Sequence, residues 1–144
     1  ERHAVALGMN RRRYIAAIVL CVYIAAVAVL CFIRQDNAPS VNFTFLGIAS
    51  DKIAHFLMFL PYPVLAYLTF ENSDSGKARA MICLAAITLT GTAVAIGTEY
   101  LQGMTEYRSY DIKDFAADCA GLLSGSLIIL TYILLKKTDR NEKP

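Results

Sequence analysis

Four long apolar stretches dominate the sequence and limit the folds open to it. They cover residues 14–33, 53–70, 80–98 and 115–135. Each is close to the roughly 20 residues that a helix needs to cross a hydrocarbon core, and His55 and Asp118 are the only acidic or basic side chains within them. Because lipid offers no partner for an unpaired backbone N–H or C=O, each stretch is expected to be helical. The predicted fold class is therefore all-α: a polytopic membrane protein with a bundle of four transmembrane helices.

The composition agrees with a membrane protein and argues against several other classes. Of the 144 residues, 56% are hydrophobic and 18% are charged, so a soluble domain of this size would be covered in apolar surface. The net charge of +2 gives no support for binding nucleic acid, which leaves membrane lipids as the expected partners. The cysteines Cys21, Cys31, Cys83 and Cys119 show no CxxC spacing and predict neither a disulfide framework nor a zinc site. Residues 1–144 are expected to form one membrane domain.

The distribution of lysine and arginine predicts how the helices are oriented. The side that holds both termini would carry Arg2, Arg11, Arg12, Arg13, Lys77, Arg79, Lys136, Lys137, Arg140 and Lys143, and the other side Arg34, Lys52, Arg108 and Lys113. The positive-inside rule then places both termini in the cytoplasm. Arginines before the first stretch are also typical of a cleaved secretory signal. That alternative is disfavoured because the apolar run exceeds the about 7 to 15 residues of an h-region and no small-residue cleavage site follows it.

The second stretch begins with the sequence DKIAHF at residues 51–56. The i, i+4 spacing of Asp51 and His55 places both on one helix face, with His55 about one turn into the membrane. An ionisable side chain at that depth needs a partner or a polar cavity. A lone histidine is typical of a hydrogen bond between helices, so a functional interpretation of His55 depends on polar groups from the other helices.

The third and fourth stretches bring such polar groups to the same end of the bundle. Thr98, Glu99 and Gln102 share a face of the third helix, above the small residues Gly91 and Ala95 that would let another helix approach. The matching stripe of the fourth helix consists of Asp111, Asp114, Asp118, Gly121 and Gly125. The helix macrodipole explains acids in the first turn, but Asp118 lies one turn deeper among apolar residues. We therefore predict a shared site at the outer end rather than unrelated caps.

Two structural features stay open at this level. The GxxxG at 121–125 could pack within the bundle or between two chains, which leaves the oligomeric state undetermined. The outer loop at 34–50 contains the sequence VNFTFL, which is apolar enough to lie along the membrane surface. The same loop could instead act as a lid over the polar site.

Taken together, these motifs resemble the VanZ-like family of bacterial membrane proteins. The family pattern runs DKxxHF, then ExxQ, then an Arg-containing loop and an aspartate-led helix ending in glycines; this chain has DKIAHF at 51–56, EYLQ at 99–102, Arg108, Asp111, Asp114 and Gly121. One departure is Asp118, where the family commonly has Asn. The resemblance implies the bacterial cytoplasmic membrane as location. Because the family's namesake is associated with teicoplanin resistance, it also implies a role in the cell envelope and in antibiotic resistance.

The first functional hypothesis is an envelope enzyme acting on a lipid-linked or amphiphilic substrate. The expected catalytic residues are His55, Asp51, Glu99 and Asp111, with Asp51 orienting His55 for proton transfer. The expected substrate-binding residues are Arg108, Gln102, Asp114 and Asp118, with Arg108 holding a phosphate or carboxylate. No serine or cysteine nucleophile is marked by its spacing. An oxygen-rich cluster with one imidazole also suits a divalent cation, although no HExxH-type pattern fixes two ligands on one face.

Two other classes of function compete with an enzyme. A non-catalytic membrane module could bind a glycopeptide or a lipid-linked cell-wall precursor, using Arg108 and the acids for recognition alone. A transporter or lipid flippase would need a polar path across the bilayer, yet the cytoplasmic halves of the apolar stretches contain no charged residue. The transporter is therefore the least favoured of the three.

Overall fold

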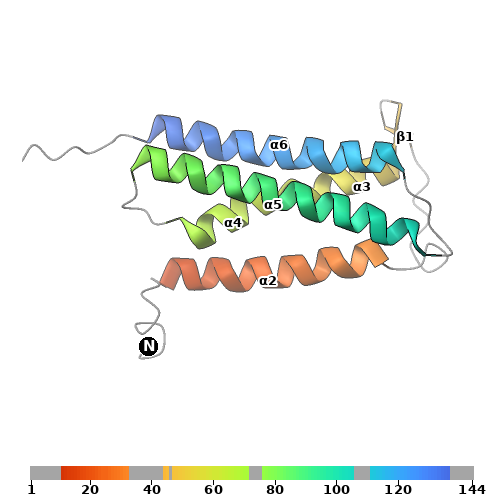
Figure 1. The fold of residues 1–144 in the computed structure, drawn as a ribbon, viewed down its shortest axis with the longest axis horizontal. Coiled ribbons are helices and arrows are strands. Elements are labelled where there is room, and N and C mark those ends of the chain that lie inside the picture. The colour runs from red at the N-terminus through yellow and green to blue at the C-terminus, as the bar shows by residue number, and fades with distance from the viewer. Residues whose placement is uncertain (1–10, 33–43, 46, 72–75, 106–110, 137–144) are drawn as a thin grey trace, which may run out of the picture.

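The computed structural model describes residues 11–32, 44–45, 47–71, 76–105 and 111–136, which form five helices and two short strands (Figure 1). In chain order these are α2 (Arg11–Phe32), β1 (Thr44–Phe45), β2 (Ile48–Ala49), α3 (Ser50–Phe59), α4 (Tyr62–Phe70), α5 (Lys77–Gly103) and α6 (Ile112–Leu135). Counting α3 and α4 together, four helical units are long and apolar enough to cross a membrane. The predicted all-α bundle is confirmed.

The helices extend further at the polar ends than hydropathy alone predicts. The third predicted stretch stops at residue 98, whereas α5 continues to Gly103 and includes Glu99 and Gln102. Likewise α6 begins at Ile112, before the predicted start at residue 115. A search for apolar residues stops at the first charged side chains, but a helix continues through them when neighbouring helices supply partners. The polar residues therefore lie on rigid helices and not in loops.

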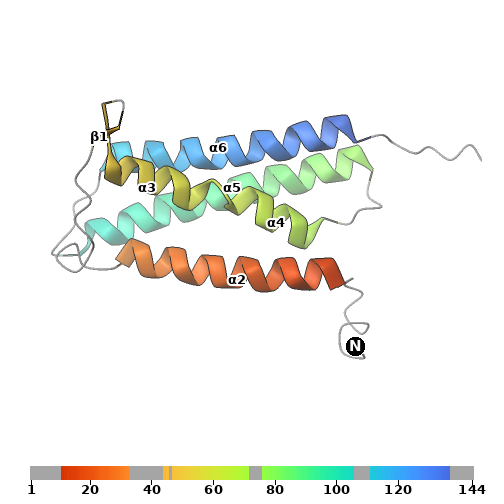
Figure 2. The same ribbon diagram turned by 180° about the vertical axis from the view of Figure 1, so that it is seen from behind.

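The second span is broken near its middle, where a single helix was expected over 53–70. Helix α3 ends at Phe59 and α4 starts at Tyr62, with Leu60 and Pro61 between them. Pro61 and Pro63 have no backbone N–H, so they cannot complete the i to i−4 hydrogen bonds of one continuous helix. The amide of Leu60 still donates to Phe56 at 3.0 Å. The break lets α3 and α4 follow different neighbours, as the change of direction in Figure 2 shows.

A small hairpin precedes α3 within the predicted outer loop. Strands β1 and β2 pair antiparallel, and Gly47 between them has a φ of 80°, a conformation that glycine adopts without the clash of a Cβ. The hairpin marks one end of the bundle, which we call the hairpin end (Figure 1). Residues 33–43 and 46 lie outside the described chain, so the role of the 34–50 loop as lid or surface segment stays a prediction.

Helices α3 and α6 pack backbone against backbone through the two glycines of the GxxxG. A Cβ on Gly121 would overlap the carbonyl oxygen of Phe56, and a Cβ on Gly125 would overlap that of Leu60. Small residues at such a crossing allow the helix axes to approach closely. Of the two alternatives for this motif, the structure shows packing within the bundle.

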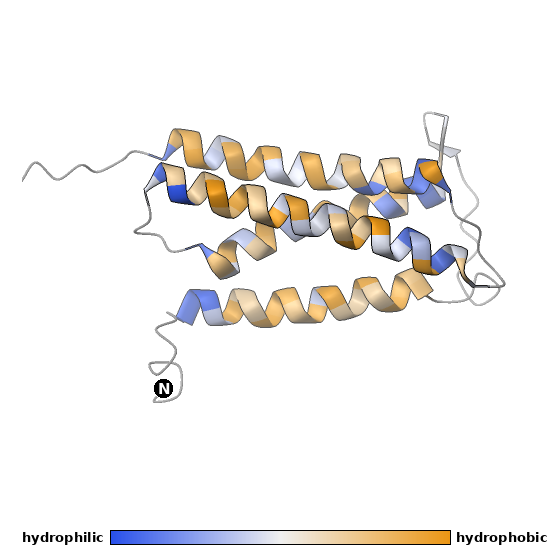
Figure 3. Cartoon of the chain, in the orientation of Figure 1, coloured by the Kyte–Doolittle hydropathy of each residue, from blue (hydrophilic) through white to orange (hydrophobic). Residues whose placement is uncertain are grey.

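The rest of the core lies between α2, α4, α5 and α6. Its buried members are Leu20, Ala66, Tyr67, Ala80, Leu84, Ile87, Ile129 and Ile133, and a smaller cluster of Phe59, Ala95 and Leu122 lies closer to the hairpin end. Large apolar side chains such as Ile82, Leu89 and Leu123 remain exposed on the outside. Figure 3 shows apolar residues along most of each helix and hydrophilic ones gathered at the ends. This is the surface of a protein that is solvated by lipid.

Candidate functional site

Polar side chains from α3, α5 and α6 meet at the hairpin end, as the sequence predicts. The buried members are His55, Glu99, Gln102, Asp114 and Asp118. Lys52, Asp51 and Asp111 surround them at lower burial. We use the name polar cluster for Asp51, Lys52, His55, Glu99, Asp111, Asp114 and Asp118. Hydrophilic segments of all three helices lie together at this end in Figure 3.

The innermost contact of the polar cluster joins His55 to Asp118. The His55 Nδ1 and Asp118 Oδ1 atoms are 2.9 Å apart, and Asp118 has no exposed surface. When Asp118 is ionised, Nδ1 donates this hydrogen bond, because a carboxylate only accepts hydrogen bonds. The other ring nitrogen, Nε2, lies 3.7 Å from Asp114 Oδ2. Asp118, the deep acid that helix capping does not explain, is therefore paired with a polar side chain of another helix.

Glu99 completes the buried part of the polar cluster from α5. Its Oε1 atom lies 3.7 Å from His55 Nδ1, and the Glu99 side chain is 1% exposed. Within the described ranges, no hydrogen-bond partner is found for this oxygen. A ligand atom from each of His55, Glu99 and Asp118 can be chosen so that all lie within 4.8 Å of one another. Among the described residues, these three side chains form a group that is close enough together to hold one metal ion.

Lys52 links the outer acids of the polar cluster. Its Nζ lies 2.5 Å from Asp114 Oδ1, 2.7 Å from Asp111 Oδ2 and 3.0 Å from Asp51 Oδ2. The sequence indicated Lys52 only as a charge that sets topology and as part of the DKxxHF motif. It did not predict that Lys52 would bind three aspartates. The motif itself was the available signal, because it places the lysine three residues before the histidine on the same helix.

Asp111 has a second, structural role at the start of α6. Its side chain accepts a hydrogen bond from the Lys113 backbone N–H at 2.8 Å and so caps the helix. The hydrogen bond from Lys52, aided by this cap, holds the pKa of Asp111 below its ordinary value of 3.8. Asp111 is therefore a charged residue at the rim, as the macrodipole argument also expects.

Two predicted site residues are placed differently from their expected roles, and a third lies outside the described chain. Asp51 was expected to orient His55, but it pairs with Lys52 with its side chain 52% exposed, and Asp118 holds the imidazole instead. Gln102 was expected to contact substrate, but its Nε2 donates to the Cys31 carbonyl at 2.8 Å and so ties α5 to the end of α2. Arg108 lies outside the described residues, and its anion-binding role stays a prediction.

The buried part of the polar cluster has more negative than positive charge. Asp114 pairs with Lys52, whereas Glu99 and Asp118 lie against the imidazole of His55. An isolated carboxylate in a low-dielectric interior is costly, so such a group takes up a proton or a cation, or is retained for function. The arrangement therefore differs from a set of independent helix caps.

An apolar cavity of about 210 Å³ lies beside the polar cluster. It is lined by Tyr23, Ile24, Val27, Ala28, Phe32, Phe59, Tyr62, Gly91, Val94 and Thr98, from α2, α3, α4 and α5. Phe59 is one helical turn from His55, and Thr98 directly precedes Glu99. The hairpin end thus combines a polar region with adjoining space suited to hydrocarbon.

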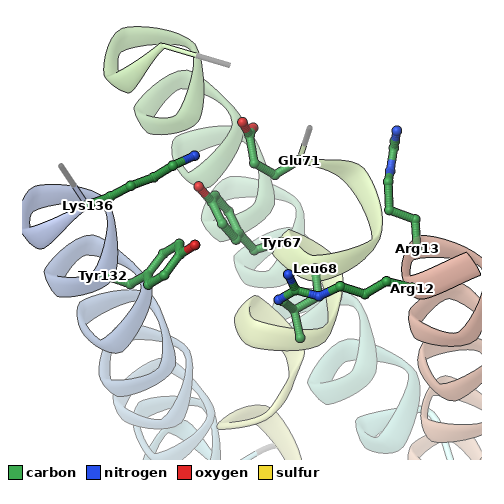
Figure 4. Close-up of a pocket in the computed structure, with 7 residues that line it drawn as sticks. All are labelled: Arg12, Arg13, Tyr67, Leu68, Glu71, Tyr132 and Lys136. Atoms are coloured by element: carbon green, nitrogen blue, oxygen red, sulfur yellow. The ribbon is translucent and has the colours of Figure 1, made fainter. Parts of the chain in front are cut away.

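The opposite end of the bundle holds a second, smaller cavity between α2, α4 and α6 (Figure 4). Its lining consists of Arg12, Arg13, Tyr67, Leu68, Glu71, Tyr132 and Lys136. Arg13 donates to the carbonyls of Thr69 and Phe70 at 3.1 and 3.3 Å, where α4 ends. Basic side chains that satisfy the last carbonyls of a helix stabilise its C-terminus. Arg13 therefore has a structural role at this end of the bundle.

The fold and the polar cluster define a polytopic membrane protein with a buried acidic site at one end of its bundle. A family model described as VanZ/LLP1 matches residues 20–135, so the chain belongs to the VanZ/LLP1 family. Over 88 residues it is 31% identical to a Schizosaccharomyces pombe protein named Uncharacterized protein C11E3.10, covering 61% of this chain and 49% of that protein. The chain thus spans about half the length of this relative. No solved structure matches the chain.

Proposed function

We propose that this VanZ/LLP1 family protein handles an amphiphilic or lipid-linked substrate of the cell envelope at its hairpin end. The observation that carries the proposal is the convergence of Glu99, Asp114, Asp118 and His55 from three membrane helices into one buried, net acidic group. Ionisable residues within membrane helices are rare because they are costly, and they mark functional sites. The substrate class follows from what surrounds this group.

The side chains of the polar cluster become more exposed from its interior to its rim. Side-chain exposure rises from 0% at Asp118 through 10% at Asp114 to 38% at Asp111 and 52% at Asp51. A headgroup at the rim would meet the Lys52 ammonium, and the predicted Arg108 would add a bidentate donor for a phosphate or carboxylate. The buried acids would then lie directly below the headgroup.

The cavity beside the polar cluster favours an amphiphile over a small polar solute. Its walls are mainly aliphatic and aromatic, and it adjoins the buried acids through Phe59 and Thr98. A hydrocarbon chain in this cavity would contact apolar side chains, as it does in lipid, while its headgroup would reach the rim. The chemistry would be a hydrolysis or transfer that uses water or a lipid hydroxyl, with His55, Glu99 and Asp118 as its catalytic residues.

A non-catalytic binding module is the second candidate, and the Lys52 contacts favour it. Its Nζ already meets three carboxylates, so the rim is a satisfied network that would hold its shape without any reaction. Such a module would bind a glycopeptide or a lipid-linked cell-wall precursor and alter envelope properties through binding alone.

Substitution of His55 separates the two candidates. The wild type, His55→Gln and His3→Gln would be expressed at matched abundance in a teicoplanin-susceptible bacterium, and purified protein in vesicles would be given a lipid-linked cell-wall precursor. His3, the other histidine of the chain, lies outside the described residues and serves as the matched control. The enzyme proposal expects His55→Gln to lower product formation by roughly 100-fold or more, because acid–base or ligand groups contribute at least that much. It also expects the resistance phenotype to be lost.

Two results would count against the enzyme proposal. If His55→Gln keeps both precursor binding and teicoplanin resistance, the protein is a binding module. If neither the wild type nor any variant alters the precursor or the susceptibility of the host, the envelope substrate itself is wrong.

A further inference from the structure

We infer that His55, Glu99 and Asp118 form a binding site for one divalent transition-metal ion. The inference deepens the proposed function by naming the cofactor of the same site, and its use in catalysis rests on that function. Binding of the ion rests on geometry, burial and charge alone. The three ligands come from α3, α5 and α6, so the ion would join the three helices at the hairpin end.

The distances from His55 Nδ1 to the two carboxylates are close to the edges of a metal coordination polyhedron. With metal–ligand bonds of about 2.1 Å, neighbouring ligand atoms lie about 3.0 Å apart in an octahedral site and about 3.4 Å apart in a tetrahedral one. His55 Nδ1 lies 2.9 Å from Asp118 Oδ1 and 3.7 Å from Glu99 Oε1. The third spacing, between the Glu99 and Asp118 ligand atoms, is at most 4.8 Å, so the two carboxylates would close on the ion as it binds.

Burial and charge support a cation at the same point. His55, Glu99 and Asp118 are each at most 2% exposed. The Glu99 Oε1 atom is buried, faces the imidazole and has no hydrogen-bond partner within the described part of the chain. Two carboxylates match the charge of one dication, which removes the cost of burying them unneutralised. Lys52, the nearby ammonium, is engaged by the outer aspartates.

The donor set selects the kind of ion. Carboxylate oxygens alone favour Mg²⁺ or Ca²⁺, whereas an imidazole nitrogen favours zinc and other transition metals. One nitrogen and two oxygens from protein would leave further coordination positions for water or substrate, which is typical of a catalytic site. Zn²⁺ and Mn²⁺ are therefore the appropriate probes.

The nitrogen that would hold the ion is His55 Nδ1, which lies 2.9 Å from Asp118 Oδ1. Its lone pair must be free for the metal, so a proton on Nδ1 would move to Nε2, the ring nitrogen 3.7 Å from Asp114 Oδ2. The neutral imidazole then keeps its one proton, and binding needs no net proton release.

The test uses the full chain in detergent, stripped with a chelator and then equilibrated with Zn²⁺ or Mn²⁺. We expect about one ion per chain by elemental analysis. Glu99→Gln should weaken binding by at least about tenfold, the lower end of what outer-shell changes alone cost. Glu71→Gln is the matched control, because it makes the same substitution in the cavity at the opposite end of the bundle, and it should bind as the wild type does.

Three results would overturn the metal site: no ion bound to folded wild type, equal binding by Glu99→Gln, or an equal loss in Glu71→Gln. If Glu99→Gln fails to fold, pulsed electron paramagnetic resonance of Mn²⁺ on the wild type replaces it, and the absence of coupling to an imidazole nitrogen refutes the site. A wild type that acts on the envelope substrate without any metal refutes the ion and leaves the proposed function. If the wild type binds the metal but the His55→Gln variant keeps full function, the proposed catalytic function is refuted and the metal site remains.

Discussion

Replacing Gly121 with alanine tests whether the close contact of α3 and α6 creates the polar cluster. A Cβ at this position would overlap the Phe56 carbonyl oxygen and lie 3.1 Å from the Leu60 nitrogen. Both neighbours are backbone atoms of α3, so they cannot turn aside as a side chain would. The helices must separate instead, and overpacking of this kind costs about 1–3 kcal/mol.

Gly97→Ala is the matched control for this change. Gly97 lies within α5, and nothing would lie within 4 Å of a Cβ added there. Alanine is favoured over glycine in a helix interior by up to about 1 kcal/mol, so Gly97→Ala should be neutral or stabilising. The two alanine variants should therefore differ by roughly 1–4 kcal/mol in the free energy of unfolding.

The same separation should reach the polar cluster. Phe56 follows His55 on α3, and Gly121 lies one turn from Asp118 on α6. A displacement of about 1 Å would stretch the 2.9 Å contact between His55 Nδ1 and Asp118 Oδ1 beyond hydrogen-bonding range. Gly121→Ala should therefore lose function as well as stability.

Unfolding by sodium dodecyl sulfate in mixed micelles, followed by circular dichroism, would measure the stabilities of both variants. Gly121→Ala should unfold at a lower detergent fraction than the wild type, and Gly97→Ala at an equal or higher one. A Gly121→Ala protein as stable as Gly97→Ala would show that α3 and α6 are not in backbone contact.

Four further predictions concern single residues. In metal-free buffer, Asp118→Asn should keep the stability of the wild type because its amide oxygen can accept the same hydrogen bond, whereas Asp118→Leu should lose about 1–3 kcal/mol by leaving the buried imidazole unpaired; the same detergent titration measures both. Gln102→Leu should cost about 0.5–1.5 kcal/mol through the lost bond to the Cys31 carbonyl, and no change in that titration would refute the tie between α5 and α2. Arg108→Lys should impair envelope function more than conservation of charge suggests, and a lysine variant equal to the wild type in the susceptibility assay would reduce Arg108 to a topology charge. A cysteine at Ser109 should react with an impermeant reagent from outside the cell; labelling only from inside would reverse the orientation.

Much of the fold could be predicted because each helix satisfies its own backbone. Four apolar stretches of sufficient length require four helices in lipid whatever their neighbours are, and the structure confirms them. The periodicity of a helix also predicted that Asp118 would face polar neighbours and that the glycines below it would meet another helix. Both expectations depend on sequence spacing within one element.

The partners within the polar cluster could not be read from spacing. Asp51 and His55 share a helix face, yet the imidazole bonds to Asp118 of α6, while Asp51 turns to Lys52. Gln102 was expected to face substrate and instead reaches the end of α2. Each of these choices depends on the rotation and relative height of two helices, to within a fraction of an ångström.

The sequence by itself thus determined the four spans and the end of the bundle at which polar residues gather. Each follows from local composition in a solvent that cannot hydrogen-bond. The tertiary structure decided that α6 meets α3 through Gly121 and that His55, Glu99 and Asp118 share one buried point. Lipid is as apolar as the side chains, so hydrophobicity does not select helix partners in a membrane. Close packing and hydrogen bonds select them, and these exist only once the helices are assembled.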